Sequence, residues 1–190
     1  MPHPRKFQRG GIGWIAFIEA PAIEELTDEQ RAAIRPVQLK SEYYRMLALD
    51  PAILRERTAV DTAIFHSREG MQRGERELCA AVSSMVTGCL ICTSTHVGFA
   101  STFSKREDDV MRIMNDGFDA DVGSRWNTIV NAAASLAEPQ PSLSQLDVDF
   151  LRGQRLAADE ILDLVHSTAF FAWANRLLLT LGDATILEPA

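Results

Sequence analysis

The sequence has no long apolar run and no excess of positive charge. The nearest candidate for a hydrophobic segment, Ile12 to Ile18, is seven residues long and ends at Glu19, whereas a membrane-spanning helix needs roughly 20 apolar residues. The segment follows basic residues, as in a signal peptide, but it is too short to predict export. The formal net charge of −7 argues against nucleic acid or an anionic membrane as a partner. We therefore expect a cytoplasmic protein.

Cysteine is also scarce, with three residues in the chain. An odd number without a framework spacing does not suit a secreted disulfide scaffold. Cys89 and Cys92 form a CxxC, and in a reducing compartment such a pair indicates redox chemistry or metal binding more often than a structural bridge. Cys79 lies on an apolar helix face and is interpreted as core, because free cysteine is commonly buried.

Helical signals recur along the chain. Thr27 and Gln30 form a capping box that opens a helix closed by Pro36, and Asp50 before Pro51 is typical of a helix N-terminus. A break is expected at residues 70–74, and Gly88 is placed to end a helix. Besides the helices that open at Thr27 and Asp50, we expect helices over residues 41–49, 75–87, 89–103, 105–116, 122–137, 146–154 and 157–181.

Evidence for strands is thin. Residues 13–18 could extend as a β-like arm, but no segment alternates at period two for long. The length of 190 residues suits one domain, and the sequence contains neither an internal repeat nor a low-complexity segment. The sequence therefore predicts one all-α domain over residues 1–190.

The candidate chemistry lies in the segment from Glu77 to His96. Cys89, Cys92 and His96 are spaced to share one helix face. Glu77 lies eleven residues before Gly88 and His96 eight after it, so in an antiparallel hairpin the two would be offset by three residues, or about 4.5 Å along the axis. We therefore predict that Glu77 orients His96, and that His96 takes a proton from a cysteine.

The roles of the two cysteines follow less directly from the spacing. Cys89 lies closer to the helix N-terminus, which lowers the pKa of a thiol. Cys92 lies four residues before His96 and is better placed to pass it a proton. We favour Cys92 as the nucleophile and Cys89 as the resolving thiol.

The spacing Glu-x11-Cys-x2-Cys-x3-His resembles the signature of the AhpD-like alkylhydroperoxidases in the carboxymuconolactone decarboxylase superfamily. Arg76-Glu77 before an apolar helix, and the closing stretch from Phe170 to Gly182, are similar to the peroxidase-related branch. The resemblance covers residues 40–182 as the core and leaves residues 1–38 as an N-terminal arm and first helix. It implies an AhpD-like helical bundle with the CxxC at the N-terminus of a core helix.

The same resemblance implies a thiol-dependent peroxidase in antioxidant defence. A hydroperoxide would oxidise Cys92 to a sulfenic acid, Cys89 would condense with it, and a dithiol reductant would restore the pair. This cycle requires no metal and no organic cofactor. The chain departs from the family pattern at Ile91 and Thr95, where members often carry His or Tyr and His, so the natural substrate does not follow from the resemblance.

Other interpretations remain open. The CxxC with His96 and Glu77 could hold zinc, or the cysteines could be buried and inert. A non-catalytic redox-sensing or scaffolding protein would keep the same fold, and a decarboxylase or lactone-handling enzyme belongs to the same superfamily, although the presence of both cysteines counts against it. The apolar closing helix and the resemblance predict a homo-oligomer, a trimer or a hexamer, with residues 10–21 available to pack on a neighbour.

Overall fold

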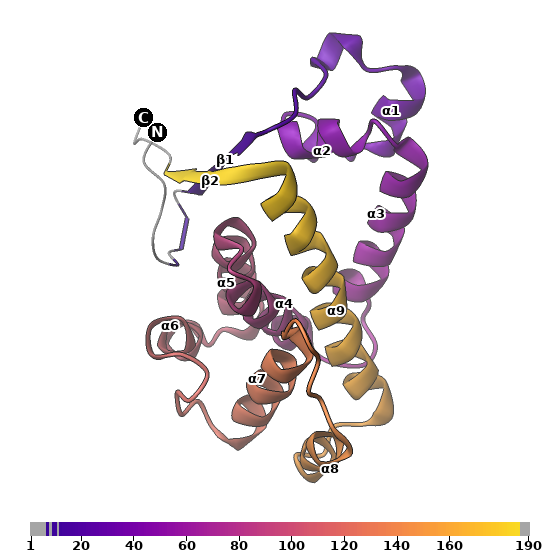
Figure 1. Cartoon of the computed structure of the whole chain (residues 1–190). Coiled ribbons are helices and arrows are strands. Elements are labelled where there is room, and N and C mark those ends of the chain that lie inside the picture. Colours follow the sequence, from indigo (N-terminus) through magenta and orange to yellow (C-terminus); the bar gives the residue numbers. More distant parts are fainter. Residues whose placement is uncertain (1–6, 8, 11, 187–190) are drawn as a thin grey trace.

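The computed structural model describes Phe7 and residues 9–10 and 12–186 of the chain, and helices dominate this part (Figure 1). The prediction of an all-α fold is confirmed, apart from one pair of strands that joins the two ends of the described chain. In chain order the elements are β1 (Ile12–Ala16), η1 (Ile23–Glu25), α1 (Asp28–Ala33), η2 (Pro36–Gln38), α2 (Glu42–Leu47), α3 (Pro51–His66), α4 (Arg73–Thr87), α5 (Leu90–Ser104), α6 (Glu107–Asp116), α7 (Ser124–Ala137), α8 (Gln145–Gly153), α9 (Ala158–Leu181) and β2 (Gly182–Ile186).

The local start and stop signals act as predicted. The Thr27 hydroxyl accepts a hydrogen bond from the Gln30 amide at 3.2 Å, and Asp50 accepts one from the Ile53 amide at 3.1 Å. Gly88 ends α4 in the left-handed region, with φ at 78°, a conformation that glycine adopts without a steric penalty. These caps satisfy backbone groups that the helix ends would otherwise leave unpaired.

The expected break before α4 is shorter than predicted. Gly74 lies inside α4, which begins at Arg73 instead of at Glu75. A Cβ on Gly74 would lie 2.6 Å from the Ser104 amide nitrogen, so glycine lets the start of α4 approach the end of α5 closely. The expected start of α6, by contrast, was two residues early, because Lys105 ends α5 in the left-handed region and α6 begins at Glu107.

Helix α4 forms the centre of the structure. Residues 74–84 of this helix are all buried, and it packs against α5, α7 and α9 (Figure 1). Its polar side chains bind neighbouring elements, as an interior position requires. Arg76 pairs with Asp163 of α9 at 3.1 Å, and Ser84 donates to Asn175 of α9 at 3.1 Å. Helix α4 is therefore held at both ends against α9.

The strand pair was only half anticipated. β1 falls within the expected arm, but β2 follows directly where α9 ends, and the two strands pair antiparallel with Ile12 opposite Ile186. Trp14 of β1 donates to the Leu178 carbonyl at 3.2 Å. A Cβ on Gly182 would lie 2.3 Å from the Trp14 ring, so the glycine leaves room for this indole. β1 thus pairs within its own chain, and the packing of residues 10–21 on a neighbouring subunit stays a prediction.

Helices α3 and α9 carry exposed apolar side chains, among them Ile53, Val60 and Trp173. These residues line one groove between the two helices. The homo-oligomer stays a prediction, and light scattering that returned only the monomer mass at micromolar concentration would contradict it. None of the helices in the described part of the chain combines the length and the hydropathy that a bilayer crossing requires.

Candidate active site

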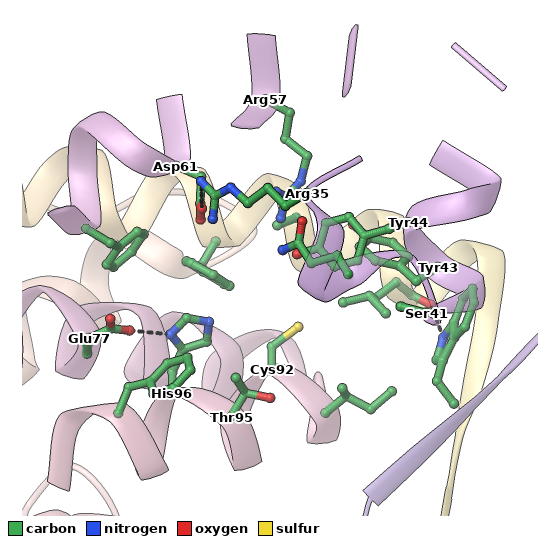
Figure 2. A pocket seen from close by; sticks show the side chains of 18 of the residues that line it. Arg35, Ser41, Tyr43, Tyr44, Arg57, Asp61, Glu77, Cys92, Thr95 and His96 are labelled. Atoms are coloured by element: carbon green, nitrogen blue, oxygen red, sulfur yellow. Dashed lines mark hydrogen bonds and ion pairs between the residues drawn. The ribbon is translucent and has the colours of Figure 1, made fainter. Parts of the chain in front are cut away.

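Glu77 and His96 come together as the helix offset predicts. Helices α4 and α5 form an antiparallel hairpin around Gly88, and the Glu77 carboxylate accepts a hydrogen bond from His96 Nδ1 at 2.7 Å (Figure 2). Both side chains are buried. An ionised Glu77 accepts the hydrogen on Nδ1, which leaves Nε2 of the neutral ring as a proton acceptor. In Figure 2 this second nitrogen points to the side of the cavity where the Cys92 sulfur lies.

A residue that the sequence analysis missed holds the other oxygen of Glu77. Arg73, one turn earlier on α4, donates from Nε to Glu77 Oε1 at 3.2 Å. Its guanidinium also lies 3.7 Å from the centre of the Phe103 ring. The spacing of four residues between Arg73 and Glu77 is a common helix pairing, and it could have signalled this contact. The carboxylate is thus fixed through both oxygens.

Aromatic rings from three helices enclose the imidazole. Phe171 of α9 lies 4.0 Å from the His96 ring between centroids, Phe99 of α5 lies at 5.8 Å, and Phe65 of α3 lies at 5.9 Å. These rings pack around the imidazole and restrict its rotation. A low local dielectric strengthens the hydrogen bond between Glu77 and His96. Phe171 both packs in the core and lines the cavity.

The two sulfurs of the CxxC are adjacent. Cys89 caps the N-terminus of α5 and Cys92 lies in its first turn, with Sγ atoms 2.6 Å apart. Both thiols are free and buried. Because the Sγ atoms are so close, the pair can form a disulfide without rearrangement of the backbone.

Their environments differ. The hydrogen bond with Cys92 and the amides of Cys92 and Ile91 lower the pKa of Cys89. The pKa of Cys92 is raised well above its ordinary value by the hydrogen bond with Cys89, by burial and by the negative charge of a Cys89 thiolate. Of the two coupled thiols, Cys89 at the helix N-terminus is therefore the one that loses its proton more readily.

One cavity of about 760 Å³ gives access to the candidate site. Glu77, Cys92, Thr95 and His96 all line it, whereas Cys89 lies behind Cys92 and lines a separate, much smaller pocket beside Trp14. Figure 2 shows the Cys92 sulfur directed into the space between His96 and the two tyrosines, Tyr43 and Tyr44. A reagent in the cavity therefore meets Cys92 first. Ile91 also lines the cavity, as does Thr95, so the two departures from the family pattern face the same space.

Two remaining expectations concern metal and the third cysteine. Within the described residues, no group of three or more His, Cys, Asp or Glu side chains is arranged to hold a metal ion. Cys79 is fully buried in the core of α4, and burial raises the pKa of its thiol, which suits the packing role predicted for it. The helix hairpin, the buried His–Glu pair and the adjacent thiols agree with the resemblance of the sequence to the AhpD-like class of helical proteins.

Comparison with known proteins supports this class. Residues 51–138 match the carboxymuconolactone decarboxylase family model. The structure of an alkylhydroperoxidase AhpD core, a peroxidase-related protein from Ralstonia eutropha JMP134, superposes with a TM-score of 0.75 at 24% identity, over 88% of this chain and 90% of that chain. The family match over residues 51–138 and the shared fold support a relationship to the AhpD and carboxymuconolactone decarboxylase superfamily.

Two further structures share the fold. A peroxidase-related protein from Silicibacter sp. TM1040 has a TM-score of 0.74 at 20% identity, over 87% of this chain and 89% of that chain. The debrominase Bmp8 has a TM-score of 0.72 at 12% identity, over 86% of this chain and 89% of that chain. No curated protein matches the sequence significantly. At these identities the structures establish a common fold, and proteins with this fold carry out more than one reaction.

Proposed function

We propose that the chain is a thiol-dependent peroxidase that reduces an organic hydroperoxide through Cys92 and Cys89. The observation that carries the proposal is the cavity in which the Cys92 sulfur, with a second sulfur 2.6 Å away, lies beside a His96–Glu77 pair. A single thiol would suffice for a nucleophile, but adjacent thiols provide both a nucleophile and a resolving group. Peroxidase-related proteins share the fold, which is consistent with this chemistry.

In the first step the Cys92 thiol gives its proton to His96 Nε2. His96 makes its hydrogen bond to Glu77 and none to either cysteine, so we propose that the proton travels through the hydroperoxide or one water. The Cys92 thiolate attacks the terminal peroxide oxygen, an S–O bond forms and the O–O bond breaks. His96 then protonates the departing alkoxide, so the products are an alcohol and a sulfenic acid on Cys92.

In the second step Cys89 attacks the sulfur of the sulfenic acid. An S–S bond forms, the S–O bond breaks, and the departing hydroxide takes the proton of the Cys89 thiol and leaves as water. The lowered pKa of Cys89 makes the loss of this proton easier. An external dithiol then reduces the disulfide by thiol exchange and is itself oxidised to a disulfide. The net reaction converts one hydroperoxide and one dithiol into an alcohol, water and a disulfide.

Catalytic turnover tests the proposal. With an organic hydroperoxide and excess dithiothreitol, the wild-type protein should consume many equivalents of peroxide per chain, above the rate of the uncatalysed reaction. Cys79→Ala is the matched control, because that thiol is buried away from the cavity, and it should retain the wild-type rate. Consumption that stops at one equivalent would instead identify a stoichiometric redox sensor.

A further inference from the structure

Arg57 is a buried cation in the cavity that the peroxidase cycle does not use. It lies on α3, its side chain is 8% exposed, and it lines the same cavity as Cys92 and His96. Figure 2 shows it extending from α3 toward Tyr44. The guanidinium carbon lies 5.4 Å from the centre of the Tyr44 ring and 5.3 Å from that of Phe170. These contacts hold the guanidinium between two aromatic rings.

Two of the three carboxylates that line the cavity are engaged with other cations, and the third, Glu42, is exposed. Asp61 pairs with Arg35 at 3.3 Å, and Glu77 binds His96 and Arg73. Within the part of the chain that the structure describes, no carboxylate forms an ion pair with Arg57, and its buried Nε makes no hydrogen bond. A buried guanidinium without an anionic partner is costly, because the charge has lost its hydration and gained no counter-charge. An anion that enters the cavity would supply the missing partner.

The groups around Arg57 are also donors. The Tyr43 hydroxyl is buried and makes no hydrogen bond of good geometry. Burial raises the pKa of Tyr43 and of Tyr44, so both phenols are neutral at physiological pH and can donate. A guanidinium fork with a phenol beside it matches the acceptor oxygens of a carboxylate. This end of the cavity therefore favours an anionic group, whereas the His96 end is enclosed by phenylalanine rings.

We propose that Arg57, with Tyr43, binds the carboxylate of an acidic organic hydroperoxide, and that the apolar body of this substrate lies along Phe65, Phe99 and Phe171. The inference rests on the proposed peroxidase function and assigns its substrate class. A cavity of about 760 Å³ is in the range of sites for organic ligands and is far larger than hydrogen peroxide requires. Arg57 is then a residue that sets substrate specificity, distinct from the Glu77–His96 pair.

The test must distinguish anion binding by Arg57 from an effect of its charge on the Cys92 thiol. The charge of Arg57 also favours the thiolate of Cys92, although less strongly than Cys89 opposes it. If Arg57 acted only on the thiol, its removal would slow every reagent equally. If it binds an anionic group, its removal should slow anionic reagents selectively.

The experiment compares alkylation of Cys92 by iodoacetate, which carries a carboxylate, and by iodoacetamide, its neutral analogue. The rates are measured on the reduced full-length protein by mass spectrometry that assigns the alkyl group to Cys92. In Arg57→Gln the ratio of the iodoacetate rate to the iodoacetamide rate should fall about tenfold, the loss expected for one charge-assisted interaction. Arg57→Lys should restore part of this ratio because it keeps the charge.

Arg55→Gln is the matched control. Arg55 lies on the same helix, two residues earlier, and pairs with Glu29 on the exposed surface, so its substitution should leave the ratio unchanged. Equal slowing of both reagents in Arg57→Gln would overturn the proposal, and so would an unchanged ratio. Circular dichroism establishes whether each variant is folded. If Arg57→Gln does not fold, the same ratio of rates is measured on Arg57→Lys.

A substrate comparison completes the test. A fatty-acid hydroperoxide and its methyl ester differ only in the carboxylate. Arg57→Gln should raise the ratio of KM for the acid to KM for the ester about tenfold, whereas any effect on kcat through the Cys92 thiol should be the same for both substrates. Because alkylation requires no peroxide turnover, loss of the iodoacetate preference would still be seen if the chain proved not to be a peroxidase, so the two proposals fail separately.

Discussion

Cys92→Ser should lose reaction with hydroperoxide by at least about a thousandfold, since removal of an essential nucleophile has effects of this order or larger. Cys92 directs its sulfur into the cavity, whereas Cys89 lies behind it and does not line that space. In Cys89→Ser, by contrast, Cys92 should still be oxidised. With no resolving thiol, its product should stop at the sulfenic acid and then over-oxidise slowly.

Both outcomes are measured by trapping the protein with a sulfenic-acid reagent. Mass spectrometry then shows which of the two cysteines carries the trapped group. The lowered pKa of Cys89 makes this a demanding test, because the pKa difference alone favours Cys89 as the nucleophile. The proposal holds that access to the cavity decides the assignment. Sulfenic acid on Cys89 in Cys92→Ser, formed at the wild-type rate, would reverse the roles.

Glu77→Gln should slow alkylation of Cys92 at neutral pH at least about tenfold, within the range of a general-base contribution. The glutamine oxygen can still accept the hydrogen from His96 Nδ1, so the ring stays in place. The negative charge that stabilises the imidazolium is lost, so His96 becomes a weaker acceptor for the thiol proton. The thiolate of Cys92 then forms at higher pH, and the pH profile of alkylation should shift upward.

Glu75→Gln is the matched control for this prediction. Glu75 is also buried on α4, but it binds Arg125 at 2.8 Å and lies outside the cavity. Its substitution should lower stability without moving the pH profile. If Glu77→Gln left the alkylation rate and its pH profile unchanged, the Glu77–His96 hydrogen bond would serve only the fold.

The hairpin that carries the site could be predicted because its determinants are local. Gly88 fixes where α4 ends, and the residue count on each side of it fixes the offset between Glu77 and His96. The three-residue offset placed them within contact, and the structure gives 2.7 Å. The cap at Thr27 could be predicted for the same reason, because a capping box is a contact between residues close in the chain.

The rest of the site depends on contacts between distant segments. Arg57 and Tyr43 lie on α3 and α2, and nothing in their sequence neighbourhoods indicates that these helices turn the two side chains toward Cys92. β2 has no alternating pattern of its own, and it forms because β1 pairs with it. In both cases tertiary packing decides what local propensity leaves open. Arg57 and Tyr43 are therefore identified from the lining of the cavity and not from a sequence motif.

The most direct test of the dithiol cycle is the intact mass of the reduced wild-type protein after one equivalent of organic hydroperoxide. The account predicts the loss of about 2 Da, the mass of the two thiol hydrogens, with no oxygen retained. Neither Cys89 nor Cys92 should then react with a thiol reagent. Addition of dithiothreitol should restore the original mass. An unchanged mass with the hydroperoxide intact, or a gain of oxygen with both cysteines still free, would contradict the central claim.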